Sequence, residues 1–399
     1  MKKLWQEKNR KLNPLIEAFE TKDDLLMDQK LIAYDIYGSL AHAQMLKKIN
    51  ILTNIEFNKL KQGLDEILKL NELEKFNLEF GDEDIHSKIE NYLTDKYGEM
   101  GKKIHTGRSR NDQVLTVLRL YSKEHLAKVK KALQSLIVIF TAFKKTYGDL
   151  AMPGYTHRQK AMPASIEIWM QSFIESFTDD ITVINNAYNL IDQSPLGSAV
   201  GFGTSLNLER AYTAEQLGFK KVQENPIYCQ NSKGKFEATI VSSLILVMQS
   251  INKFSSDVML FTTQEFNFLT VSNEITTGSS IMPQKKNIDI AELLRSKVHI
   301  LLGFYVQIVS MGSNLISGYN RDLQDIKKPL MESFAITLES LQVTGILLQN
   351  LTPNQEILKQ AMTEDLFATE KVLTLVKQGV PFRQAYQKVK SEMKGGEKE

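Results

Sequence analysis

The sequence predicts an all-α protein built on very long helices, and two observations carry this prediction. Proline is scarce: the 399 residues include nine prolines, and none lies between Pro14 and Pro153. Because proline breaks helix interiors, its absence permits long uninterrupted helices. Apolar residues recur three and four positions apart over long runs, whereas no convincing segment alternates with the period of two that marks a strand. We therefore expect an extended helical bundle.

Four long helical runs follow from this periodicity. They cover Gln113–Tyr147, Ala164–Asp192, about Phe236 to Phe261, and Ala291 to Leu315. Glycine- and proline-containing segments separate them, such as AMPGYTHRQKAMP between the first two runs. Shorter amphipathic helices return near Asn354. The sequence thus predicts three domains: an amino-terminal helical domain (1–109), a central long-helix bundle (110–353) and a short carboxy-terminal helical domain (354–399).

The composition narrows the class of protein. Hydrophobic residues make up 42% and charged residues 24%, which is typical of a globular protein with a substantial core. The net charge of +2 gives no bulk electrostatic reason to expect nucleic acid or a membrane as a partner. Cys229 is the only cysteine, which excludes an internal disulfide and a cysteine-based metal site. The amino-terminal MKKLWQEKNRKLN leads into no apolar segment, so we expect no signal peptide and a cytoplasmic protein.

One segment is long enough to span a bilayer. No Lys, Arg, Asp or Glu lies between Lys297 and Arg321. The segment does contain polar residues, among them His299, Gln307 and Asn314, and it has no partner span. We therefore expect a helix buried inside the bundle.

Polar residues gather at the expected helix boundaries, in EDIH, HTGRSRND, GYTH, TTGSSIMPQKKN and YNRDLQDIK. Each cluster also has a purely structural interpretation, for example Asp112 as a helix N-cap and His157 as a loop histidine. Together they indicate a site for anions. The cations Arg108, Arg110, Lys285 and Lys327 can hold carboxylates, and neutral donors can orient them: Ser109, Asn111, Thr156, Ser279, Asn287, Tyr319 and Gln324.

The sequence gives weaker support to nucleotide binding, to a nucleophile–base triad and to metal binding. GSAVGFGTS fits neither a P-loop nor a dinucleotide fingerprint, so we interpret it as a structural turn that could approach a ligand. No nucleophile–base triad and no metal-binding motif is evident. We expect no metal and no cofactor.

The loop GSSIMPQKKN resembles the signature loop of the fumarase/aspartase superfamily of lyases. HTGRSRNDQV, GYTH, QKKN and YNRDLQDIK resemble specifically its argininosuccinate lyase branch, and the similarity extends over nearly the whole chain. The resemblance implies three mostly helical domains around a central bundle, a homotetramer whose sites are shared between subunits, and reversible cleavage of argininosuccinate to arginine and fumarate.

The resemblance also implies roles for individual residues. Ser279 matches the catalytic base, and Lys285 matches a residue that stabilises the aci-carboxylate intermediate together with Asn287. His157 matches the group that moves a proton at the leaving nitrogen, with Glu292 polarising it. The full set of expected substrate-binding residues is Asp84, Ser109, Arg110, Asn111, Thr156, Asn287, Tyr319, Gln324 and Lys327. The serine loop is expected to be mobile because its closure would admit substrate and complete the site.

The sequence departs from the family pattern at several positions. Ile288 stands where the loop usually has proline, and Asp23 or Asp24 stands where a small hydroxyl is expected, so that an acid would face substrate carboxylates. Arg321 stands where lysine is common, and the carboxy-terminal domain is short. Two alternatives stay open: another fumarate-releasing lyase, acting on adenylosuccinate, aspartate or malate, and a non-catalytic crystallin-like structural protein.

Overall fold

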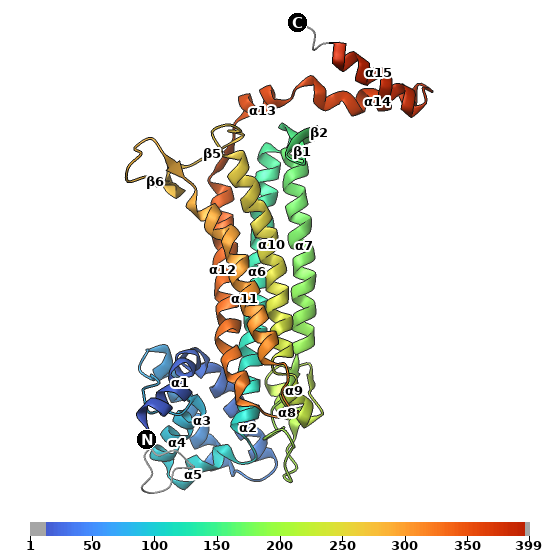
Figure 1. The fold of residues 1–399 in the computed structure, drawn as a ribbon. Helices are drawn as coiled ribbons and strands as arrows, with labels where there is room; N and C mark the ends of the chain where they lie inside the picture. Colours follow the sequence, from blue (N-terminus) through green and yellow to red (C-terminus); the bar gives the residue numbers. More distant parts are fainter. Residues whose placement is uncertain (1–12, 396–399) are drawn as a thin grey trace. The chain divides into compact units, whose positions relative to one another are not determined.

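The structure is a computed structural model that describes residues 13–395. All but one residue of the amino-terminal segment MKKLWQEKNRKLN lies outside the described residues. Helices supply most of the regular structure, as Figure 1 shows, which confirms the all-α class. The chain forms two compact units. The first unit comprises the described part of residues 1–130 with 182–246 and 299–338, and the second comprises 131–181, 247–298 and 339–399.

Five long helices dominate the chain (Figure 1). Four of them confirm the predicted runs: α6 (Arg110–Tyr147), α7 (Ile166–Ile191), α10 (Lys235–Phe261) and α11 (Asp289–Met311). The fifth, α12 (Lys327–Gln349), is absent from the four runs that the periodicity predicts.

The uncharged segment near α11 is less buried than its composition predicts. The helix ends at Met311, and one of its sides is buried through Leu294, Val298, Leu301 and Ile308. Its other side exposes large apolar side chains: Leu293, Ile300, Leu302, Val306 and Val309. In the single chain the helix is therefore buried along one side only. Among the described residues a different stretch, Pro226–Phe261, has the length and hydropathy of a possible membrane span, but 61% of its apolar window is buried, as in the core helix of a soluble protein.

The first unit contains the amino-terminal helices and one end of each long helix. Local signals explain where its helices begin: Thr53 and Glu56 form a reciprocal capping box at α3, and Asn13 caps α1. The remaining elements of this unit are α1 (Pro14–Asp28), η1 (Gln29–Leu31), α2 (Ile32–Lys48), α3 (Asn54–Glu72), α4 (Ile85–Tyr97), α5 (Glu99–Lys102), η2 (Lys103–His105), β3 (Gln193–Ser194), α8 (Arg210–Gln216), β4 (Lys221–Val222), α9 (Pro226–Asn231) and η4 (Arg321–Ile326).

Buried polar groups in the first unit are satisfied by neighbouring elements. The guanidinium of Arg119 on α6 donates to the carbonyl of Gln193 at 2.7 Å and to the hydroxyl of Ser232 at 2.8 Å. Lys123, one turn further along α6, forms an ion pair with Asp192 at 2.5 Å. These contacts fix the loop after α7 and the turn before α10 against α6.

The second unit has an aromatic core between α6, α7 and α10. Phe140 of α6 lies 5.2 Å from Phe177 and 5.0 Å from Phe254, measured between ring centroids, and Trp169 stacks on Phe254 at 6.0 Å. The indole N–H of Trp169 donates to Asp257 at 2.9 Å, which satisfies its one polar atom.

Short antiparallel strands correct the expectation that the chain has no strand segment. The second unit contains β1 (Ala151–Thr156) paired with β2 (Gln159–Ser165), β5 (Leu269–Val271) paired with β8 (Leu351–Pro353), and β6 (Thr277–Gly278) paired with β7 (Lys286–Asn287). Its other elements are η3 (Asn273–Ile275), α13 (Gln355–Ala361), η5 (Glu364–Phe367), α14 (Ala368–Lys377) and α15 (Phe382–Gly395). The three domain boundaries expected from the sequence stay a prediction.

Candidate active site

The motif GYTH forms the tip of a β-hairpin. β1 ends at Thr156 and β2 begins at Gln159, so His157 and Arg158 are the two residues of the turn. Both have positive φ, 52° and 61°, as a type I′ turn requires, although neither is the glycine or asparagine that such turns prefer. Thr156 and His157 are exposed in the single chain. A non-glycine backbone in the left-handed region is a costly arrangement that is frequent at functional sites.

The serine-containing loop is also a hairpin, closed at its base. Thr277 pairs with Asn287 and Gly278 with Lys286, and the hydroxyl of Thr277 donates to Asp289 at 2.6 Å. The residues between them, 279–285, therefore project from a fixed base.

Within this loop, the Ser279 Oγ accepts the N–H groups of Ile281 at 3.3 Å and Met282 at 3.1 Å. Ser279 is half-buried and Lys285 is exposed. Asn287 is half-buried and lies two residues before α11 begins, and Glu292 lies exposed in the first turn of that helix. Among the described residues no hydrogen bond or ion pair joins His157 to Glu292, or Ser279 to Lys285.

Residues of HTGRSRND form the start of α6 in the first unit. Ser109, not Asp112, is the N-cap: its carbonyl accepts the first helical hydrogen bond, from Gln113 at 3.1 Å. Asp112 is the third helical residue and is fully buried. Its carboxylate accepts the N–H of Ser109 at 2.9 Å and the N–H groups of Gly197 at 2.9 Å and Ala199 at 3.0 Å. The predicted turn GSAVGFGTS is thus tied to the beginning of α6.

The same turn approaches a candidate substrate-binding residue. The Nδ2 of Asn111 donates to the carbonyl of Val200 at 3.4 Å. Ala199 has φ of 52°, in the left-handed region, and Asp112 holds its N–H. The position of Asn111 therefore depends on a loop that Asp112 fixes.

Arg110 is engaged by acidic residues of EDIH. Its guanidinium forms a two-point contact with Glu83, with one N–H···O distance of 2.9 Å, and donates to Ser87 at 2.9 Å. Its Nε lies 3.3 Å from Asp84, which in turn caps α4 by accepting the N–H of Ser87 at 2.7 Å. Arg110 and Asp84 thus join α6 to α4, and their part in substrate binding stays a prediction.

The motif YNRDLQDIK places Gln324 and Lys327 against α1. The buried ammonium of Lys327 pairs with Asp28 at 2.5 Å and with Asp24 at 2.7 Å. The side-chain N–H of Gln324 donates to the carbonyl of Glu20 at 2.9 Å. Burial raises the pKa of the Tyr319 phenol, and the nearby charges of Arg321, Asp24, Lys327 and Arg110 act on it as well. These residues and the start of α6 therefore belong to one charged region of the first unit.

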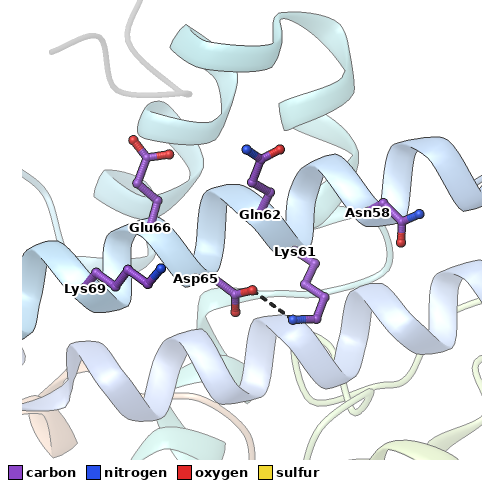
Figure 2. A pocket seen from close by; sticks show the side chains of 6 residues that line it. All are labelled: Asn58, Lys61, Gln62, Asp65, Glu66 and Lys69. Atoms are coloured by element: carbon purple, nitrogen blue, oxygen red, sulfur yellow. Dashed lines mark hydrogen bonds and ion pairs between the residues drawn. The ribbon is translucent and has the colours of Figure 1, made fainter.

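A cavity of about 1160 Å³ in the first unit opens onto this region. Asp24, Gln324 and Lys327 line it together with α1 residues such as Phe19 and α11 residues such as Phe304. A smaller depression of about 370 Å³ lies on α3, where Figure 2 shows side chains such as Lys61, paired with Asp65 at 2.8 Å. Its residues come from one helix, so it brings no distant polar groups together.

The sequence did not predict a buried hydrogen-bond network that includes His86 of the EDIH motif. The imidazole of His86 forms a short hydrogen bond with Asp35, Asp35 accepts from Ser39 at 3.1 Å, and Ser39 accepts from Arg108 at 2.9 Å. Burial works against the charged form of His86, but the Asp35 charge outweighs it and raises the pKa of His86. Burial likewise opposes ionisation of Asp35, yet His86 and Arg108 leave its pKa below its ordinary value. Arg108, expected to hold a carboxylate of the ligand, is nine-tenths buried and faces this network instead.

The predicted residues divide between the two units. The first unit holds Asp84, Ser109, Arg110, Asn111, Tyr319, Gln324 and Lys327, and the second holds Thr156, His157, Ser279, Lys285, Asn287 and Glu292. Donors and cations dominate both groups, which suits a ligand carrying several carboxylates.

Known proteins are similar in sequence to this chain over its whole length. A family model described as Lyase matches residues 7–303. An argininosuccinate lyase of Thermotoga neapolitana is 42% identical over 397 residues, which cover 100% of this chain and 99% of the relative. An argininosuccinate lyase of Phocaeicola vulgatus is 40% identical over 394 residues, 99% of this chain and 88% of the relative.

Solved structures share the fold. An EDDS lyase in complex with formate superposes with a TM-score of 0.81 at 23% identity, covering 98% of this chain and 78% of that chain. A fumarate lyase:delta crystallin from Brucella melitensis bound to cobalt gives 0.79 at 17% identity, covering 97% and 89%. These likenesses show the fold, and the sequence relatives show the family. The chain is a lyase and belongs to the argininosuccinate lyase family of the fumarase/aspartase superfamily.

Proposed function

We propose that this lyase catalyses the reversible β-elimination of argininosuccinate to arginine and fumarate. The observation that carries the proposal is the serine- and lysine-bearing hairpin loop between β6 and β7, in a chain that matches argininosuccinate lyases over its full length at about 40% identity. Arginine biosynthesis is the process that such a reaction would serve.

The reaction demands strong stabilisation of negative charge. A proton leaves the carbon next to a carboxylate, and the resulting carbanion places a second charge on that carboxylate. Donors held in fixed positions in a dry pocket are the largest contribution to such a step. Lys285 and Asn287 supply an ammonium and an amide, and the free N–H groups at the start of α11 follow directly after them.

Ser279 is the base in this mechanism. A serine hydroxyl is a weak base at its ordinary pKa, so its alkoxide must be stabilised. The two backbone N–H groups that its Oγ accepts, from Ile281 and Met282, would favour the charged form. Lys285 would add a positive charge once the loop closes. Ile281 is 83% exposed at the tip of the loop, which leaves apolar surface that closure over a substrate could bury.

His157 would protonate the leaving nitrogen, with Glu292 as its polarising partner. Asn111, Thr156, Tyr319, Gln324 and Lys327 would bind the substrate, with Ser109, Arg110 and Asp84 beside them. Because no hydrogen bond or ion pair joins His157 to Glu292 in the described part of the chain, we place their interaction in an assembly of several chains.

We propose that this assembly is a homotetramer with shared sites. Asn111 lies in the first turn of α6, and Thr156 lies nine residues beyond its last turn. A helix of 38 residues is about 57 Å long, which is too far for one small substrate to reach both ends. Antiparallel packing of identical chains would bring the two motifs together. The exposed apolar side of α11, with Leu293, Ile300 and Val306, offers a surface for such packing. The family resemblance also supports the three predicted domains and a cytoplasmic location.

The substrate assignment is tested by fumarate absorbance. Purified protein is incubated separately with argininosuccinate, adenylosuccinate, aspartate and malate, and we expect release of fumarate from the first alone. Release from one of the other three would assign the chain to a different reaction of the superfamily, and release from none would favour a crystallin-like structural protein.

The shared site is tested by complementation. His157→Ala and Asn111→Leu are each expected to inactivate the enzyme, and subunit exchange between them should restore activity. With random assortment in equal amounts, roughly a quarter of the sites would have both residues native. Hybrid tetramers that stay as inactive as their parents would contradict the shared-site model.

A further inference from the structure

Two buried polar residues on one side of α2 fasten the segment HTGRSRND. Ser39 and His42 are three positions apart, which places them on the same face of the helix, and both are at most 1% exposed. The imidazole of His42 donates to the carbonyl of Thr106 at 2.8 Å, and the hydroxyl of Ser39 accepts from the guanidinium of Arg108 at 2.9 Å. The segment is therefore held against α2 immediately before α6 begins.

Asp35, one turn before Ser39 on α2, uses its two oxygens for two different elements. One oxygen accepts the Ser39 hydroxyl at 3.1 Å, and the other forms the short hydrogen bond with the imidazole of His86. His86 lies in the first turn of α4, the helix that Asp84 caps. The Asp35 carboxylate thus joins the segment before α6 to the start of α4.

The orientation of Arg108 depends on this link. Arg108 is nine-tenths buried, and within residues 13–395 its Nε has no hydrogen-bond partner. An unpaired buried N–H is costly, so the contact from the guanidinium to Ser39 is important for holding this side chain. A hydroxyl has a single proton, and Ser39 donates that proton to Asp35, which turns its lone pairs toward Arg108. Asp35 therefore sets the direction in which Ser39 accepts.

A second carboxylate ties the start of α4 to the other binding segment. Asp28 of α1 pairs with the Lys327 ammonium at 2.5 Å, and its other oxygen accepts the N–H of Ile85 at 3.2 Å. Ile85 directly precedes His86. Burial raises the pKa of Asp28, and the charges of Lys327 and His86 act against that rise. A path of buried groups therefore runs from Lys327 to Arg108, with the start of α4 in its middle.

We propose that Asp35 is a positioning residue, which acts through Ser39 and Arg108 to hold the start of α6 where it binds substrate. The inference rests on the proposed function, in which Arg110 and Asn111 of that first turn are substrate-binding residues. Asp35 itself does not touch the substrate. A network that only stabilised the fold would change the amount of folded enzyme but not the affinity of that enzyme for substrate.

The test is steady-state kinetics with argininosuccinate on wild type, Ser39→Ala and Asp35→Ala. Substitutions along a coupling network change the coupled binding by about 3- to 30-fold, so we expect both variants to raise KM by this factor. We expect kcat to stay within about threefold, because displaced binding residues weaken the ground state and the transition state alike. The matched control is Ser243→Ala: Ser243 is 2% exposed, and its hydroxyl donates to the carbonyl of Ile240 in its own helix at 2.6 Å. Its KM should equal that of the wild type.

A second measurement shows whether Ser39 acts through Arg108. Arg108→Met removes the guanidinium and should raise KM by itself. If Ser39 serves to hold that guanidinium, adding Ser39→Ala to Arg108→Met should raise KM no further, whereas two independent effects would multiply.

A KM for Ser39→Ala within twofold of wild type overturns the inference, and so does multiplication of the two effects in the double variant. Asp35→Ala leaves Arg108 and His86 buried without their anion, and if circular dichroism shows that it does not fold, Ser39→Ala and the double variant decide. A wild type that releases no fumarate from argininosuccinate refutes the proposed function. Titration calorimetry with fumarate then replaces KM: the role of Asp35 stands if Ser39→Ala weakens fumarate binding at least threefold, and it falls if binding is unchanged or if the wild type binds no fumarate.

Discussion

Replacing Asp112 with alanine should destabilise the fold at a point that also carries the candidate site. The Asp112 carboxylate is fully buried and accepts three backbone N–H groups, from Ser109, Gly197 and Ala199, at 2.9 to 3.0 Å. Alanine leaves all three donors without their acceptor. It also releases the loop whose Val200 carbonyl accepts from Asn111.

The expected magnitude follows from these three hydrogen bonds. A buried donor left unsatisfied costs about 1–3 kcal/mol, so three would cost about 3–9 kcal/mol without relaxation. Water entering beside the exposed residues around Val200 offsets part of this, so we expect a loss of about 3–5 kcal/mol in the free energy of unfolding. Asp112→Asn keeps one acceptor oxygen and should lose about 1–3 kcal/mol.

Urea unfolding followed by helical circular dichroism measures the loss, with all variants at one protein concentration because an oligomer gains stability with concentration. Asp65→Ala is the control: it also removes a helical aspartate, but the pair of Asp65 with Lys61 is solvent-exposed (Figure 2) and should contribute less than about 0.5 kcal/mol. A loss below about 1 kcal/mol for Asp112→Ala, similar to that of the control, would refute the role assigned to this carboxylate.

Three further predictions concern chemistry and pH. Ser279→Ala should lower kcat by about 100-fold or more while substrate still binds, and a variant that keeps more than about a tenth of wild-type kcat would refute the assignment of the base. Lys285→Met should lower kcat strongly, whereas a rise in KM alone would make this lysine a uniform binding group. The pair of His86 and Asp35 should stabilise the fold fully between the unfolded pKa values, 3.8 for aspartate and 6.5 for histidine. That stability is lost as pH rises through the raised pKa of His86 and as pH falls through the lowered pKa of Asp35. Denaturation at a series of pH values measures the loss. On the alkaline side, the free energy of unfolding of His86→Asn should fall less steeply with pH than that of the wild type.

The long helices could be predicted from the sequence where an apolar stripe marks their buried side. In α12 the apolar stripe is interrupted, because several residues on the buried side of this helix carry hydroxyl groups: Ser333, Thr337, Ser340 and Thr344. The hydroxyls of Ser333, Thr337 and Thr344 donate to carbonyls four residues earlier, at 2.7 to 2.8 Å, which satisfies them within the helix. Pro329 lies in the first turn of α12, a position at which proline is tolerated.

The candidate site was predictable as a set of residue types but not as a set of partners. The motifs HTGRSRND and YNRDLQDIK indicated Arg110, Gln324 and Lys327, because the order of residues within each motif is distinctive. The partners of these residues lie far away in sequence: Lys327 and Asp28 are 299 positions apart, and Gln324 and Glu20 are 304 positions apart. Such contacts depend on how α1 packs against η4 and α12, which local periodicity does not encode.

The acidic residue in place of the expected hydroxyl acquires a physical explanation from these partners. By sequence, an acid at Asp23 or Asp24 should repel substrate carboxylates, and the structure gives Asp24 a partner. In the structure its carboxylate lies 2.7 Å from the Lys327 ammonium, which Asp28 also contacts from the buried side. A buried carboxylate is tolerated when a cation and hydrogen bonds compensate its lost hydration. The pairing with Lys327 therefore compensates the negative charge that the sequence pattern alone would place beside the substrate carboxylates.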